Sequence, residues 1–195
     1  MESWSEKLIT DSNKNICELK KKEVTKENFI KKIADENPKL LILNGHGDKT
    51  KICGYNREVL VEANKNEHVF KDKIIHTLAC SAGDILGPKT ILAGGIAYIG
   101  YKENFKAACS FQKTKRGQQI DLLAELFFTP AYLVVNELLQ GKTVGEAYQA
   151  SRDMYIKNLR RAVAHPDQAY NDFAASRLFH NINYQVCWGN HLAKL

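Results

Sequence analysis

Short apolar runs closed by small residues alternate along this chain with longer stretches whose apolar residues recur at helical spacing. The runs at 39–44, 73–79 and 95–101 have the length of a strand and few polar residues, which is typical of strands buried on both faces. The alternating residues at 15–20 and the run at 184–188 predict a first and a last strand. The pattern therefore predicts a sheet with at least three parallel strands in a row.

Amphipathic segments between these runs predict helices that cover the sheet. Thr25 can cap a helix that ends at Asn37 and Pro38. Further helical segments are expected at 89–94, at 120–140 as one kinked helix or two short ones around Pro130, and at 144–164. The other segments predict a small hairpin at 50–55, a helical turn at 58–64 and an exposed loop at 102–118. A strand, a helix and a second strand in this order imply a parallel, right-handed crossover, so we expect an α/β fold with a mostly parallel central sheet.

Length and composition fit one globular domain. The 195 residues give room for one sheet covered on both faces, and the hydrophobic content of 44% argues against wholesale disorder. No apolar run approaches the roughly 18 residues that a membrane-spanning helix needs, and the first residues lack the apolar core of a secretory signal. We therefore expect a protein that does not act at a membrane.

The five cysteines are odd in number, lie far apart and form no C-x-x-C pair. Free thiols in a reducing compartment fit this pattern better than a disulfide framework or a zinc site, so we expect a cytoplasmic protein without a metal. The net charge of +6 raises the question of a nucleic-acid surface. The densest basic clusters lack interleaved aromatic residues, so solvated faces are the favoured interpretation and no nucleic-acid partner is expected.

Two residues with reactive side chains follow the first two buried runs. His46 follows the run at 39–44, and Cys80 follows the run at 73–79. Ligands bind in open parallel sheets beyond the carboxyl ends of the strands, and a thiol becomes a nucleophile when an adjacent imidazole favours its thiolate. The flanking glycines let the backbone come close to a substrate, and the N–H groups of Gly47 and Cys80 are candidates for an oxyanion hole. Each residue taken singly also fits a plainer interpretation, with Cys80 as a core thiol and His46 as a turn residue.

The segments Asn44–Asp48 (NGHGD) and Leu78–Gly83 (LACSAG) resemble the His-Gly and Ala-Cys motifs of the caspase-like cysteine peptidases, which include caspases, gingipains, clostripain, separases and CHAT domains. The runs at 94–100 and 141–147 are similar to the next strand and a later helix start of CHAT and gingipain-type members. The resemblance implies a thiol protease with His46 as general base and Cys80 as nucleophile. It also implies one three-layer α/β/α sandwich domain over residues 1–195 that lacks the usual first strand and helix.

The resemblance further implies where a substrate binds. In separase-like relatives an acidic residue after the third strand helps to recognise a basic P1 side chain, and Glu103 falls in that region while Asp84 follows the cysteine motif. The basic run at 113–116 is then a candidate self-cleavage loop. The expected partner is a protein or peptide substrate, without a cofactor. The alternative is a catalytically silent module that binds a regulatory protein through an open sheet edge. The oligomeric state is left open.

Overall fold

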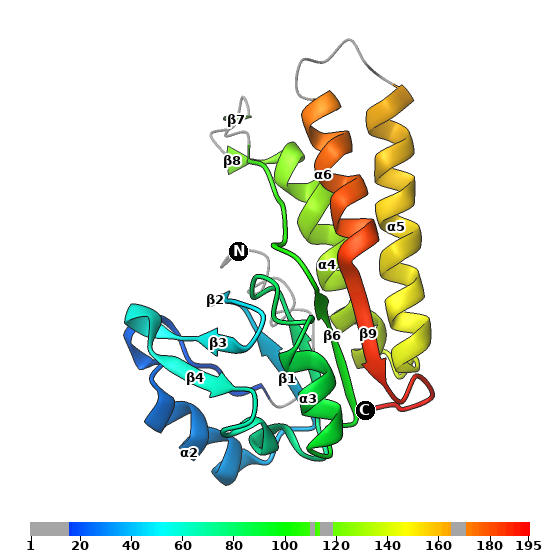
Figure 1. Ribbon diagram of the computed structural model, residues 1–195. Coiled ribbons are helices and arrows are strands. Elements are labelled where there is room, and N and C mark those ends of the chain that lie inside the picture. Colours follow the sequence, from blue (N-terminus) through cyan, green and yellow to red (C-terminus); the bar gives the residue numbers. More distant parts are fainter. Residues whose placement is uncertain (1–15, 110–111, 114–118, 165–170) are drawn as a thin grey trace.

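A four-stranded sheet in the order β1-β5-β6-β9 forms the centre of the computed structural model, which describes residues 16–109, 112–113, 119–164 and 171–195 (Figure 1). Strands β1 (Leu40–Leu43), β5 (Ile74–Thr77) and β6 (Ala97–Tyr101) are parallel neighbours. Strand β9 (Gln185–Gly189) pairs antiparallel with β6. The expected α/β class and mostly parallel sheet are therefore confirmed, and so are the positions of the three apolar strands and of the last strand. Burial on both faces is confirmed for β5 and β6 but not for β1, an edge strand in which Ile42 is exposed.

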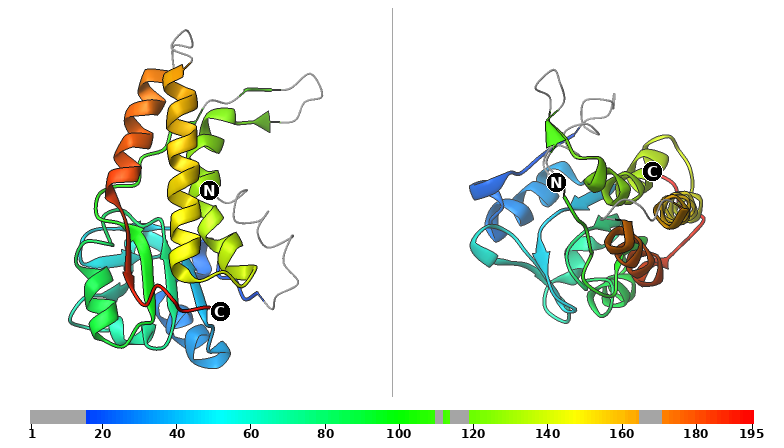
Figure 2. Two further views of the ribbon diagram at one scale, coloured as in Figure 1. Left: turned by 90° about the vertical axis from the view of Figure 1, so that its right-hand side faces the viewer. Right: turned by 90° about the horizontal axis from the view of Figure 1, so that it is seen from above.

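The two inner strands, β5 and β6, are buried on both faces: successive side chains of a strand point to opposite faces, and every residue of these two strands is buried. In β5, Ile74 packs in a cluster with residues of α4 (Leu122–Leu139) and α5 (Val144–Ala164), whereas Ile75 packs in a cluster with residues of α2 (Lys26–Glu36) and α3 (Leu86–Leu92). Helix α6 (Asn171–Tyr184) packs against α5 and α4 (Figure 2). No helix in the described ranges is both long and apolar enough to cross a bilayer.

A second, three-stranded antiparallel sheet follows β1 directly. It consists of β2 (His46–Gly47), β3 (Lys51–Cys53) and β4 (Val59–Glu62), in that order (Figure 1). The expected helical turn at 58–64 is wrong, because residues 59–62 form a strand of the second sheet in which Leu60 and Val61 are both buried. The expected hairpin exists but is displaced toward the N-terminus, so that it begins at His46 itself.

Three further elements differ from expectation. The described part of the expected strand at 15–20 is not a strand, because Lys20 enters the short 3-10 helix η1 (Lys21–Glu23) and its N–H donates to the carboxylate of Glu23. Helix α6 was not expected, because Phe173 and Phe179 are exposed while Asn181 is buried, and this obscures the apolar stripe. The loop after β6 includes a short hairpin of two-residue strands, β7 (Gln112–Lys113) and β8 (Gln119–Ile120). Residues 114–116 of the candidate self-cleavage loop lie outside the described residues.

Helix α4 continues through Pro130 as a single helix. A proline cannot donate the backbone hydrogen bond to the residue four positions earlier, so the carbonyl of Leu126 loses its helical partner. The side-chain amide of Asn158 on α5 donates to this carbonyl at 2.9 Å, and the Tyr155 hydroxyl donates to the neighbouring carbonyl of Phe127 at 3.1 Å. These two buried side chains of α5 therefore stabilise the middle of α4.

His76 of β5 is a core residue. It is fully buried, its ring centroid lies 6.4 Å from that of Tyr132, and burial lowers its pKa from 6.5 to about 4. The fold therefore favours the neutral form of the His76 imidazole.

We expect acid to destabilise the fold partly through His76. Between pH 6.5 and about 4 the unfolded chain binds a proton that the folded chain does not, so stability is complete above pH 6.5 and falls by about 3 kcal/mol as pH decreases through this window. Urea unfolding of the wild type and of His76→Leu at several pH values measures this contribution. The difference in unfolding free energy between the two proteins should change across the window, and parallel pH curves would show that His76 is not the cause.

Candidate active site

The strand register places His46 and Cys80 at equivalent positions. Leu43 and Thr77 are paired at the carboxyl ends of β1 and β5, and His46 and Cys80 follow them by the same number of residues. The Thr77 hydroxyl donates to the Leu43 carbonyl at 3.0 Å and accepts from the N–H of Ala79 at 3.0 Å. This side chain joins the two strand ends, so the turns that carry the imidazole and the thiol start from fixed positions.

Gly47 brings these two turns into contact. A Cβ atom on Gly47 would lie 2.7 Å from the carbonyl oxygen of Lys51, 3.0 Å from the Cβ of Ala79 and 3.4 Å from the carbonyl oxygen of Cys80. Only a residue without a side chain allows this approach. The structure therefore brings Gly47, the chain neighbour of His46, into direct contact with the turn that contains Cys80.

Neither of the two expected oxyanion donors uses its N–H group in a hydrogen bond with the described residues. The N–H of Asp48 donates to the carbonyl of Lys51, which makes the next pair of the ladder, Gly47 and Ile52, a pair without mutual hydrogen bonds. The N–H of Gly47 is therefore not used by β3. The N–H of Cys80 has no acceptor among the residues that the structure describes. Within the described residues, both N–H groups are therefore available to a ligand.

Cys80 is a free, half-buried thiol, and His46 is exposed. The carbonyl of Gly83 in the cysteine turn accepts a hydrogen bond of 2.7 Å from the indole N–H of Trp188, and the N–H of Gly83 donates to Tyr101 at 2.9 Å. Trp188 therefore orients the turn from β9. A distant strand that donates to a loop carbonyl leaves no local signal in the sequence.

The two expected substrate-binding carboxylates lie in different environments. Asp84 forms an ion pair of 3.0 Å with Lys49, whose backbone carbonyl accepts from Ile85 and Leu86. Glu103 forms no ion pair within the described residues, and its carbonyl accepts from the N–H of Ser81 at 3.3 Å. The hydrogen bond and the charge of Asp84 raise the pKa of Lys49, with a smaller contribution from Glu103. Both carboxylates therefore affect Lys49, but only Asp84 is paired with it. The Glu103 carboxylate has no ion-pair partner within the described residues.

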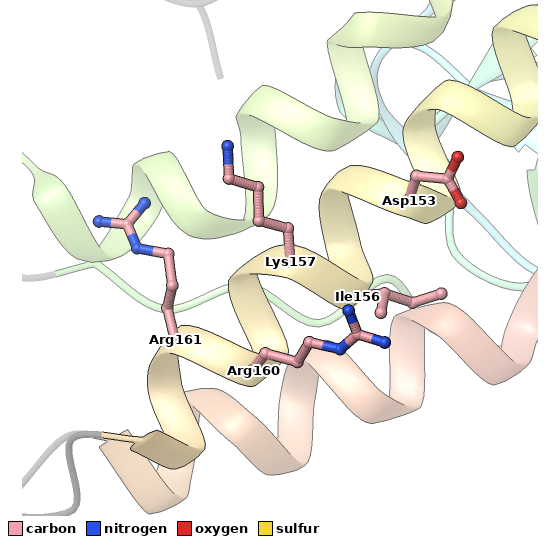
Figure 3. Close-up of a pocket in the computed structure, with 5 residues that line it drawn as sticks. All are labelled: Asp153, Ile156, Lys157, Arg160 and Arg161. Carbon is pink, nitrogen blue, oxygen red and sulfur yellow. The ribbon is translucent and has the colours of Figure 1, made fainter.

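The rest of the described chain offers no candidate site that competes with the one at the strand ends. No cluster of three or more His, Cys, Asp or Glu side chains within it could hold a metal ion. A surface hollow beside α5 is lined by side chains of that helix alone (Figure 3), which are Asp153, Ile156, Lys157, Arg160 and Arg161. The three cations of this hollow are exposed, as expected for a solvated basic face.

We found no match to this chain among protein-family models, curated proteins or solved structures. The chemistry must therefore be inferred from the site. A thiol, an imidazole and two free N–H groups at adjacent strand ends can carry out nucleophilic acyl transfer, in which the thiolate attacks a carbonyl carbon and the N–H groups stabilise the oxyanion.

Proposed function

We propose that this protein is a cysteine endopeptidase with a three-layer α/β/α fold of the caspase-like type. The observation that carries the proposal is the packing of the His46 hairpin on the Cys80 turn, through Gly47, at the carboxyl ends of two adjacent parallel strands. The burial of β5 and β6 on both faces supports the three-layer arrangement. The free cysteines support a reducing compartment such as the cytoplasm.

In the proposed reaction, His46 accepts the proton of the Cys80 thiol and the thiolate attacks the carbonyl carbon of the scissile peptide bond. The N–H groups of Gly47 and Cys80 donate to the resulting oxyanion. The tetrahedral intermediate collapses to an acyl-enzyme as His46 gives its proton to the leaving amine. His46 then removes a proton from water, which hydrolyses the thioester and restores the thiol.

The proposed substrates have a basic P1 side chain, and Glu103 is the better candidate to bind it. The charge of Asp84 is already neutralised by Lys49, whereas Glu103 has no ion-pair partner among the described residues. A carboxylate without a partner gains more from the Lys or Arg of a substrate than one that must first release its own cation.

Cleavage of a peptide library with basic, acidic and apolar P1 residues tests this function. The wild type should cleave the basic members fastest, and Glu103→Gln should reduce the kcat/KM for these by about tenfold while leaving the apolar members unchanged. The matched substitution Asp84→Asn should have the smaller effect on P1 preference. A larger effect of Asp84→Asn would assign the P1 contact to Asp84, and no cleavage of any member would contradict the peptidase.

The alternative function is a catalytically silent module that binds a regulatory protein. The observation that favours it is the outer edge of β1, with which no described strand pairs. The carbonyls of Lys39 and Leu43 accept hydrogen bonds from the β5 side, so the backbone groups of Leu40 and Ile42 point to the open edge. The Ile42 side chain is 39% exposed, and no charged residue or proline protects this strand.

A substitution at this edge separates the two functions. Ile42→Lys places a charge on the outer edge of β1 and should abolish the binding of a partner strand. The peptidase proposal expects this variant to retain cleavage, because Ile42 lies before the site residues in β1. Loss of partner binding in Ile42→Lys, together with a wild-type Cys80 that does not react with peptidyl inhibitors, would favour the alternative.

A further inference from the structure

The residue after Cys80 adopts a backbone conformation that its side chain disfavours. Ser81 has a φ of 56° and is 7% exposed. The left-handed region is unfavourable for residues with a Cβ atom, so it persists only where neighbouring contacts hold it, and such residues are concentrated at functional sites. The orientation of the peptide bond between Cys80 and Ser81 therefore depends on the contacts that hold Ser81.

Ser81 accepts a hydrogen bond from the N–H of Asp84 within its own turn, and two further bonds join it to the segment after β6. The Ser81 hydroxyl donates to the side-chain oxygen of Asn104 at 2.9 Å, and its N–H donates to the carbonyl of Glu103 at 3.3 Å. The longer contact is the weaker one. The side chain of Asn104 is thus the stronger of the two contacts that the segment after β6 makes with Ser81.

Helix α6 holds Asn104 in turn, because the segment after β6 runs alongside this helix (Figure 2). The carbonyl oxygen of Asn104 lies 3.0 Å from the Nε2 atom of His180. The buried side chain of Asn181 accepts from the N–H of Lys106 at 3.0 Å and donates to its carbonyl at 2.8 Å. These bonds hold the backbone on both sides of Phe105, so Asn104 is presented to Ser81 from a rigid support.

We propose that Asn104 is a positioning residue for Cys80. It keeps Ser81 in the left-handed conformation, which directs the Cys80 thiol and N–H group toward the hairpin of His46 and Gly47. The inference rests on the proposed peptidase and adds a residue that the resemblance did not point to. Asn104 is exposed and its bond with the buried Ser81 is part-buried, so water can reach the Asn104 side of the bond, and the loss of this bond should affect catalysis more than stability.

Kinetics of Asn104→Ala, Ser81→Ala and the double variant test this role with a basic-P1 peptide. Each single variant should lower kcat about tenfold with KM within about twofold, because a misdirected nucleophile slows the chemical step without weakening substrate binding. Since both variants remove the same bond, the double variant should be no slower than either one. Asn104→Asp keeps the acceptor oxygen and should restore most of kcat. The control Asn183→Ala, which removes an exposed amide from α6, should behave as the wild type.

A second measurement does not depend on peptidase activity. The rate of alkylation of Cys80 by iodoacetamide, followed by mass spectrometry across pH, should fall near neutral pH in Asn104→Ala, because the thiolate loses its orientation toward His46. An inactive wild type with slower alkylation in this variant would contradict the peptidase and retain the positioning role. Unchanged kcat and unchanged alkylation in Asn104→Ala and Ser81→Ala would overturn the role. Additive losses that parallel a lower melting temperature would overturn it as well, because they indicate a structural effect.

Discussion

Replacing Cys80 with alanine is expected to lower the rate of peptide cleavage by at least about a thousandfold, because no other group can form the acyl-enzyme. The substitution removes one half-buried sulfur atom at a turn outside the apolar clusters, so the melting temperature should change little. The kcat/KM for a fluorogenic peptide with a basic P1 residue, measured beside a thermal melt, gives both quantities.

The matched control is Cys17→Ala, which removes another free thiol. Cys17 is exposed and interacts with Lys32 of α2, away from the ends of β1 and β5, so this variant should cleave at the wild-type rate. Cleavage by Cys80→Ala at a rate similar to that of the control would exclude Cys80 as the nucleophile.

Replacing Gly47 with alanine is expected to lower kcat/KM by about a hundredfold. The new Cβ would lie 2.7 Å from the carbonyl oxygen of Lys51 and 3.0 Å from the Cβ of Ala79, and neither atom belongs to a flexible side chain. The hairpin must move away from the cysteine turn to relieve this overlap. In the proposed mechanism, this movement takes His46 away from Cys80 and the N–H of Gly47 away from the oxyanion.

Gly141→Ala serves as the control for loss of stability. Gly141 has a φ of 83°, so alanine is strained there, but a Cβ would meet no atom within 4 Å. Gly141 lies between α4 and α5, away from the strand ends, so this variant should be less stable yet cleave at nearly the wild-type rate. Full activity in Gly47→Ala would show that the contact between the two turns is not needed for catalysis.

The sequence predicted the central strands and the positions of His46 and Cys80 because these features depend on local patterns. Apolar runs of strand length mark β1, β5 and β6, and a residue that follows such a run must lie at a strand end. Parallel pairing then places the two strand ends at the same edge of the sheet. The register of Leu43 with Thr77 is the part that only the structure provides.

The remaining parts of the site depend on contacts between distant residues, which leave no periodic signal. Trp188 donates to Gly83 from the last strand, and Asn104 accepts from Ser81 although α3 and β6 separate the two residues in the sequence. The second sheet was hidden because β2 contains only His46 and Gly47, which is too short for an alternating pattern. The pairing of Asp84 with Lys49 likewise needed the structure, because Lys49 belongs to the hairpin and not to the cysteine turn.

The most direct test of the proposed dyad is the labelling of the purified protein by peptidyl acyloxymethyl ketones with basic, acidic or apolar P1 residues, mapped by mass spectrometry. A dyad predicts that the basic reagent modifies Cys80 first among the five cysteines, and that His46→Ala loses this reaction while keeping its melting temperature. Labelling that follows exposure, with Cys17 and Cys109 modified and Cys80 unmodified in the wild type, would contradict the dyad.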